Sequence, residues 1–139
     1  MPIVLGCHKG IGPGATGYAL VASDNFSARY DLDRGAGIFS RPTHKLYGQS
    51  YLDKILVLQT AKGGVATAWM LHEMIARRVA PKGIIFDRAN TILAQGAVFA
   101  DLTMVDRFDA GDPTMLMRTG DELMIEPANG RVTILNRSS

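Results

Sequence analysis

The sequence predicts a mixed α/β fold in which a β-rich first half packs with a small β/α layer. Short apolar runs separated by Gly, Asp, Asn and Pro fill the first half, which is typical of brief strands. After residue 54 the pattern changes to alternating strands and helices, and the tail carries a hairpin signal. Nothing resembling a linker divides the 139 residues, so we expect one domain over residues 1–139.

The strands of the first half are expected to be short, because each apolar run is soon interrupted by turn-forming residues. They are expected at Ile3–Leu5, Gly17–Ala22, Gly37–Phe39 and Lys54–Leu58. The glycine-rich stretch "GIGPGATGYALV" superficially resembles a nucleotide loop, but no amphipathic helix follows it. We therefore interpret these glycines as turns that lead into the second strand.

A helix is expected over residues 65–79, where apolar residues recur at three- and four-residue spacing. Ala80 and Pro81 should end it, with Arg77 and Arg78 suited to the negative end of the helix dipole. Strands are expected next at Gly83–Phe86 and Thr103–Val105. The predicted apolar stripe of the helix consists of Val65, Ala68, Trp69, Leu71, Ile75 and Val79.

Two further helix starts and a hairpin are expected in the last third of the chain. Asn90 can cap a helix over residues 91–100, and Asp112 followed by Pro113 indicates another short helix. The tail reads as two strands joined by residues 127–130, whose Asn-Gly pair favours a tight turn.

Composition excludes several classes of protein. The chain has 15 basic and 13 acidic residues, a net charge of +2 and no basic cluster, so no nucleic-acid partner is expected. Its one cysteine, Cys7, can form no internal disulfide and cannot hold an iron–sulfur cluster, which needs several thiolates. With no signal-peptide pattern and no run of about 18 apolar residues, we expect no membrane association and a cytoplasmic location.

The loop Lys62-Gly63-Gly64 is the first candidate site, because it joins a strand to a helix N-terminus. Backbone N–H groups and the positive end of the helix dipole favour an anion there. Lys62 can add a charge, and the Thr67 hydroxyl lies on the first helical turn. A strand-to-helix turn also commonly contains glycine without binding anything, so both interpretations stay open.

His44 and Arg41 form the second candidate, in the loop before the strand that starts at Lys54. A solvated surface histidine is the simpler interpretation. If the loop faces an active site, His44 with Arg41 could orient a carboxylate or move a proton. His8 beside Cys7 predicts no metal site, because neighbours on a strand point to opposite faces.

Three blocks of sequence, in this order, resemble the swivelling domain of the aconitase X family of dehydratases. They are "HKLYGQS" from His44, "KILV" from Lys54 leading into the glycine loop, and "AP" at residue 80 followed by "ILAQGA" at residue 92. With the upstream "GATGYALV", the resemblance covers roughly residues 14 to 126.

The resemblance implies a β/β/α swivelling domain that is either fused to a large catalytic portion or paired with one as a small subunit, and we expect the small subunit of a hydro-lyase. Its partner would be a large catalytic subunit with an iron–sulfur cluster, and its substrate a small hydroxy acid such as cis-3-hydroxyproline or a phosphorylated mevalonate. The loop would close over the substrate carboxylate. The residues implied are Thr67 and His44 for catalysis, and Lys62, Gly63, Gly64 and Arg41 for substrate binding.

One departure from the family pattern leaves the activity open. The family loop typically reads Arg-Gly-Ser-Ser-Ser-Gly-Ser, whereas this chain has "KGGVATA" from Lys62, which leaves Thr67 as the remaining hydroxyl. Lys62 keeps the charge but loses the guanidinium fork. The alternative is therefore a binding or regulatory module that has lost the family serines and that could form a homo-oligomer. Independent catalysis by Thr67 or His44 is a third interpretation, with no visible pairing of base and nucleophile in its favour.

Overall fold

A computed structural model describes residues 2–26, 31–33, 35–60, 65–89, 98 and 101–138, without the side chains of residues 65–68. Seven strands of this part form one sheet in the order β1-β9-β8-β2-β5-β6-β7. A separate pair joins β3 (Leu32–Asp33) to β4 (Ile38–Phe39). The sheet strands are β1 (Ile3–Gly6), β2 (Ala15–Val21), β5 (Lys54–Thr60), β6 (Gly83–Arg88), β7 (Thr103–Val105), β8 (Glu122–Glu126) and β9 (Arg131–Asn136).

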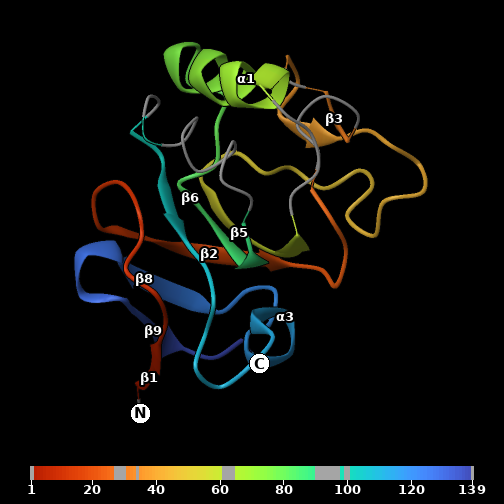
Figure 1. Cartoon of the computed structure of the whole chain (residues 1–139). Coiled ribbons are helices and arrows are strands. Elements are labelled where there is room, and N and C mark those ends of the chain that lie inside the picture. The colour runs from red at the N-terminus through yellow and green to blue at the C-terminus, as the bar shows by residue number, and fades with distance from the viewer. Residues whose placement is uncertain are drawn as a thin grey trace.

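Strand β2 joins the two halves of the sheet. It pairs in parallel with β5, where Ala19 lies opposite Ile55, and antiparallel with β8, where Gly17 lies opposite Leu123. Strands β2, β5, β6 and β7 are all parallel, whereas β8 and β9 form an antiparallel hairpin and β1 pairs antiparallel with β9 (Figure 1). The predicted α/β class is therefore confirmed, and the β-rich part and the β/α layer share one sheet.

The two edge strands of this sheet approach each other. Cys7, directly after β1, forms an antiparallel bridge with Phe108, and Ile11 forms another with Met104 of β7. A sheet whose edges meet must be strongly curled, as twist allows. Both chain termini lie at the end of the molecule away from α1 (Figure 1).

Helix α1 (Val65–Ala76) covers one face of the parallel strands with Leu71 and Met74, both 1% exposed. Ile75 and Val79 are partly buried, as predicted. The prediction for Trp69 is wrong, because its side chain is 68% exposed.

The physical reason is the helix period. Trp69 precedes Leu71 by two residues, which places the two side chains about 200° apart around the helix. The buried face of α1 is thus narrower than the predicted stripe, and the indole lies on its solvent side.

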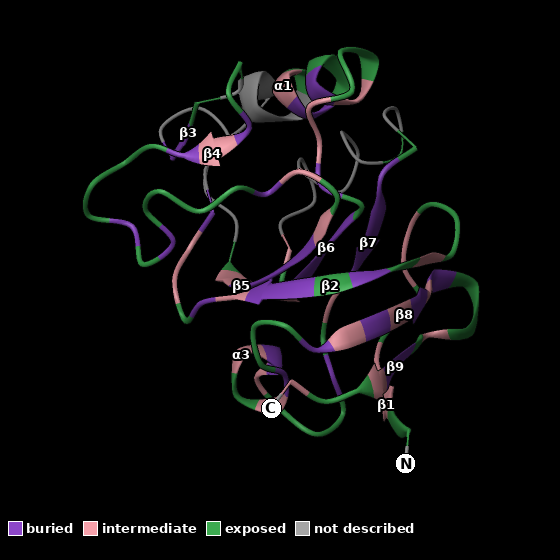
Figure 2. Ribbon diagram, turned by 180° about the vertical axis from the view of Figure 1, so that it is seen from behind, coloured by how far each residue is buried: buried purple, intermediate pink, exposed green. Residues whose placement is uncertain are grey.

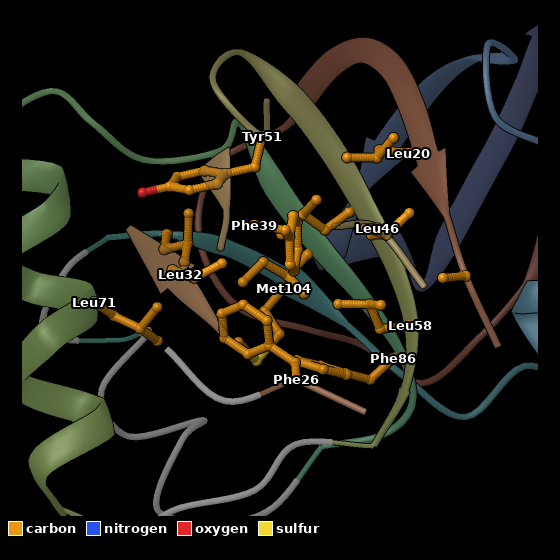
Figure 3. Close-up of a cluster of buried hydrophobic side chains, with 14 of the residues drawn as sticks. Leu20, Phe26, Leu32, Phe39, Leu46, Tyr51, Leu58, Leu71, Phe86 and Met104 are labelled. Atoms are coloured by element: carbon orange, nitrogen blue, oxygen red, sulfur yellow. The ribbon is translucent and has the colours of Figure 1, made fainter. Parts of the chain in front are cut away.

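The core beneath α1 is closed by the segment that contains β3, β4 and the following loop. Phe26, Phe39 and Tyr51 are fully buried there and pack over Leu58 and Phe86 of the sheet (Figure 3). Phe39 and Tyr51 meet edge to face, with ring centroids 6.0 Å apart. These aromatic contacts fix the 31–51 segment against the sheet.

The opposite face of the sheet forms a second core with α3 (Pro113–Leu116). Met117, just after α3, is buried against this face, and Figure 2 shows the central strands as mostly buried. Asp112 caps α3 by accepting a hydrogen bond from the Thr114 N–H, as predicted from Asp-Pro. Met115 is 79% exposed and belongs to neither core.

The predicted strand positions agree with the structure, with differences at their ends. Strand β5 extends to Thr60 and β6 to Arg88, two residues further than expected in each case. The C-terminal hairpin turns through a 3₁₀ helix, η1 (Pro127–Asn129), and Gly130 has a left-handed φ of 62°. The helix predicted over residues 91–100 lies outside the described residues, apart from residue 98.

No helix in the described part of the chain is both long enough and apolar enough to cross a bilayer.

Candidate functional site

The carboxyl ends of four parallel strands meet at one edge of the sheet, which we call the carboxyl edge. Strands β2, β5, β6 and β7 end there at Val21, Thr60, Arg88 and Val105. In open α/β sheets, ligands bind outside the carboxyl ends of the strands, because the connecting loops and helix N-termini converge there. The carboxyl edge is therefore the first place to look for a site.

The predicted anion loop leaves from this edge. Lys62, Gly63 and Gly64 lie between the last residue of β5, Thr60, and the start of α1 at Val65, and they are outside the described residues. The side chain of Thr67, on the first turn of α1, is also outside them. The described neighbours thus locate both ends of the loop at the carboxyl edge.

A short segment after β2 holds the end of β5 in place. The Gln59 N–H donates to the Asp24 carbonyl at 2.9 Å, and the Phe26 N–H donates to the Thr60 carbonyl at 2.8 Å. The Thr60 hydroxyl also hydrogen-bonds to the side-chain oxygen of Asn25. These bonds extend the pairing of β5 to Thr60, two residues before Lys62.

His44 lies beneath this segment, and the expectation that it is a surface residue is wrong, because it is 5% exposed. Its Nε2 lies 2.8 Å from the Asn25 carbonyl, and its Nδ1 accepts the Leu46 N–H at 3.0 Å. This pattern assigns the proton to Nε2 of a neutral ring. The ring also stacks on Phe39, with centroids 4.7 Å apart.

Two carboxylates flank the same histidine. Oxygens of Asp24 and Asp31 each lie 3.8 Å from His44 Nε2, beyond hydrogen-bond distance. Burial acts to raise the pKa of Asp24, but backbone N–H donors of Lys45 and Asn25 outweigh it and leave that pKa lowered. His44 thus lies among polar groups that are hydrogen-bonded within the chain. We call His44, Asn25, Asp24, Asp31 and Arg41 the His44 junction.

Arg41, which was predicted to bind a carboxylate, already binds side chains of this junction. Its Nη1 lies 2.8 Å from Oδ1 of the buried Asp31, and its Nε donates to the Thr43 hydroxyl at 3.0 Å. The side chain is 45% exposed. Because two of its donors are engaged, Arg41 has less capacity to grip a ligand carboxylate than the sequence indicated.

A groove of about 500 Å³ lies at the ends of β6 and β7. Arg88 and Asp87 line it from β6, and Arg107 and Asp109 line it from the segment after β7. Arg107 has a left-handed φ of 58° and pairs with Asp106 at 3.6 Å. The sequence did not single out Arg88, because the predicted strand ended at Phe86, two residues before it.

Cys7 lies near this groove but fits poorly as a metal ligand. Partial burial, with added repulsion from Asp106 and Asp109, raises the pKa of its thiol to about 11. Metals bind thiolate, which is scarce near neutral pH at such a pKa. Among the described residues, no three His, Cys, Asp or Glu side chains are placed to hold a metal ion together.

These features define a class of protein, a curled mixed α/β domain with loops at the carboxyl edge of its sheet. Hydrogen bonds within the domain hold Thr60, where the loop between β5 and α1 begins. The family model of the aconitase X swivel domain matches residues 4–134. The chain belongs to that family, which confirms the resemblance found in the sequence.

The relatives cover nearly the whole chain. A phosphomevalonate dehydratase small subunit from Methanococcoides burtonii is 30% identical over 88% of this chain and 89% of its own length. One from Thermococcus kodakarensis is 32% identical over 92% and 93%. A crystal structure of Thermococcus kodakaraensis aconitase X in its holo form is 30% identical, with a TM-score of 0.88 over 96% of this chain and 99% of the matched chain.

Proposed function

We propose that this protein is the small subunit of a hydro-lyase of the aconitase X type. It closes its carboxyl edge over a small hydroxy acid that is bound on a large catalytic subunit. The observation that carries this proposal is similarity along almost the full length of proteins named as dehydratase small subunits. The matching fold of aconitase X, with a TM-score of 0.88, supports it.

An iron–sulfur cluster, if the complex contains one, is proposed to lie in the large subunit. Cluster iron is held by several thiolates, whereas this chain has one cysteine, with a thiol pKa of about 11. The residues of this chain therefore do not fit the cluster. What the chain contributes is binding, orientation and exclusion of water.

The loop after Thr60 is proposed to meet the substrate carboxylate. Lys62 supplies a positive charge, and Gly63 and Gly64 let backbone N–H groups approach closely. Thr67 supplies the hydroxyl that the serines provide in the family pattern. The hydrogen bonds that fix Thr60 support this role, because an anchored loop end reduces the entropy lost on closure.

His44 is proposed to act by positioning the loop. Both ring nitrogens are hydrogen-bonded within the chain and the residue is buried, so in this arrangement it holds Asn25, which bonds to Thr60. A direct role for His44 in proton transfer stays a prediction. Arg41 supports the same junction through Asp31.

The first test is to reconstitute the complex with its large subunit and to assay dehydration of mevalonate 5-phosphate and of cis-3-hydroxyproline. We expect turnover of one of them by the complex and none by this chain without its partner. Robust dehydration by the isolated, metal-free chain would refute the small-subunit role. A stable homo-oligomer with no large partner would instead favour the non-catalytic binding module.

Within the active complex, Lys62→Ala and Thr67→Ala test the loop. We expect Lys62→Ala mainly to raise KM and Thr67→Ala mainly to lower kcat, because the first removes charge and the second a hydroxyl near the reacting atoms. Lys82→Ala is the matched control, since Lys82 is exposed and lies just before β6, at the opposite edge. Kinetics unchanged in both loop variants would show that the loop is only a connection.

A further inference from the structure

The segment between β1 and β2, residues 7–13, joins the two edges of the curled sheet, and we call it the closing strap. At its start the Cys7 N–H donates to the Gly130 carbonyl of the C-terminal hairpin at 2.9 Å. In its middle Ile11 and Met104 of β7 exchange both backbone N–H···O bonds, at 2.8 and 3.0 Å. The antiparallel and parallel parts of the sheet are therefore held together here as well as by β2.

The closing strap needs glycine because its backbone lies directly on β7. A Cβ atom at Gly10 would lie 2.1 Å from the Met104 carbonyl oxygen and 2.7 Å from a methyl group of Val105. Both distances are far below van der Waals contact, so a larger residue must lift the strap or displace β7. At Gly14, just after the strap, the nearest atom would be 3.4 Å away, an ordinary contact. The glycine-rich stretch thus allows two backbones to cross closely.

The strap is held mainly by its backbone. None of its residues is buried, and Cys7 and Ile11 are only partly buried at the margins of the two cores. In contrast, all three residues of β7 are buried. A segment with exposed backbone hydrogen bonds and few buried apolar contacts opens at a lower free-energy cost than the core that it covers.

We propose that the closing strap opens and closes as one unit while the rest of the domain stays folded. Opening breaks the bonds from the His8 N–H to the Asp106 and Arg107 carbonyls, both at 3.2 Å. His8 and Arg107 line the groove at the ends of β6 and β7 together with Asp109. The strap is therefore a conformational device that controls one wall of this groove, and the inference does not depend on the proposed function.

Cys7 can report the opening, because it is the only cysteine in the chain and lies at the start of the strap. In the closed state burial, with repulsion from Asp106 and Asp109, raises the pKa of its thiol to about 11, which slows alkylation near neutral pH. In the open state the thiol regains an ordinary pKa of about 8.5. The rate at which iodoacetamide alkylates Cys7 in the native chain thus measures how often the strap opens.

Urea separates opening of the strap from unfolding of the whole domain. We expect the alkylation rate to depend only weakly on urea below the unfolding transition, because opening of the strap exposes little surface. Exchange of the β2 and β5 amides should depend on urea steeply, since it requires global unfolding.

Thr103→Val tests whether the strap moves as one unit. The variant removes the hydrogen bond of 2.6 Å from the Thr103 hydroxyl to the Pro13 carbonyl, at the end of the strap away from Cys7. We expect alkylation of Cys7 to become about three- to tenfold faster, because one opening event exposes both ends. Thr133→Val, at a buried threonine on β9, is the matched control and should leave the rate at the wild-type value.

Gly10→Ala and Gly14→Ala form a second matched pair. The first should speed alkylation of Cys7 by about ten- to a hundredfold, because the added methyl group lifts the strap from β7. The second should change the rate by less than about twofold. If Gly10→Ala does not fold, Thr103→Val still decides the matter.

Two outcomes would overturn the inference. One is a wild-type alkylation rate in Thr103→Val or in a folded Gly10→Ala variant, which would mean that only the start of the strap frays. The other is an alkylation rate that rises with urea as steeply as exchange of the β2 and β5 amides. Cys7 would then be reached only by unfolding of the whole domain.

Discussion

His44 shows how one buried side chain can control a neighbouring loop. Its ring joins the 41–50 segment to Asn25, and Asn25 in turn bonds to Thr60 at the end of β5. Each of these links is a hydrogen bond to a neutral group or a stacking contact, and the ion pair between Arg41 and Asp31 lies beside them. A substitution should act first on stability and, through Thr60, on the loop.

We expect His44→Ala to lower the free energy of unfolding by about 2–4 kcal/mol. It leaves a cavity beside Phe39 and deprives the Asn25 carbonyl and the Leu46 N–H of their partners. Urea unfolding of the isolated chain measures this loss. Gln49→Ala, at an exposed position of the same segment, should change the value by less than about 0.5 kcal/mol, and an equal loss in both variants would contradict the role of His44.

At the scale of elements, α3 depends on its cap. The Asp112 carboxylate accepts hydrogen bonds from the Thr114 N–H and hydroxyl and from the Gln59 amide. Partial burial acts to raise the pKa of Asp112, but these donors outweigh it and leave the pKa lowered. The cap also ties α3 to the end of β5 on the face opposite α1.

Asp112→Ala should therefore destabilise the protein by about 1 kcal/mol near neutral pH. Because the folded-state pKa is lowered, the charged cap stabilises fully above the unfolded pKa of about 3.9, and its contribution disappears as pH falls through the folded pKa. The difference between wild type and Asp112→Ala should thus shrink in acid. Asp112→Asn can cap the helix without ionising, so its free energy of unfolding should fall less in acid than that of the wild type. A stability difference between wild type and Asp112→Ala that did not vary with pH would contradict the role of the charge.

The secondary structure was largely predictable because local signals set it. Strands β2, β5, β6 and β7 follow apolar runs bounded by turn residues, and Asp112 with Pro113 marks α3 by local capping chemistry. Trp69 was misplaced because spacing identifies an apolar stripe but not which part of it faces the core.

The candidate site was only partly predictable. The Lys62 loop follows from a strand–glycine–helix pattern, which is local. The burial of His44 and the commitment of Arg41 to Asp31 depend on partners distant in the sequence. The position of Arg88 opposite Thr60 depends on the register between β5 and β6, which no single stretch of sequence encodes.

At the scale of the whole molecule, β2 makes the two halves of the sheet into one cooperative unit. It hydrogen-bonds to β5 on one side and to β8 on the other, and its residues Ala19 and Leu20 are buried in opposite cores. Opening either half therefore exposes part of β2. The edge strands β1 and β7 share fewer bonds with the rest, since each has one neighbour within the sheet.

Native-state hydrogen exchange of the isolated chain should reflect this arrangement. We expect amides of β2 and β5 to exchange slowest, through global unfolding, and those of β1 to exchange faster through local opening. Adding low urea should accelerate β5 and β8 together, because both lose their partner when β2 is released. If β8 and β9 exchanged as one unit well before β5 and β6, the antiparallel part would open independently, and β2 would be only a connection between two separately stable parts.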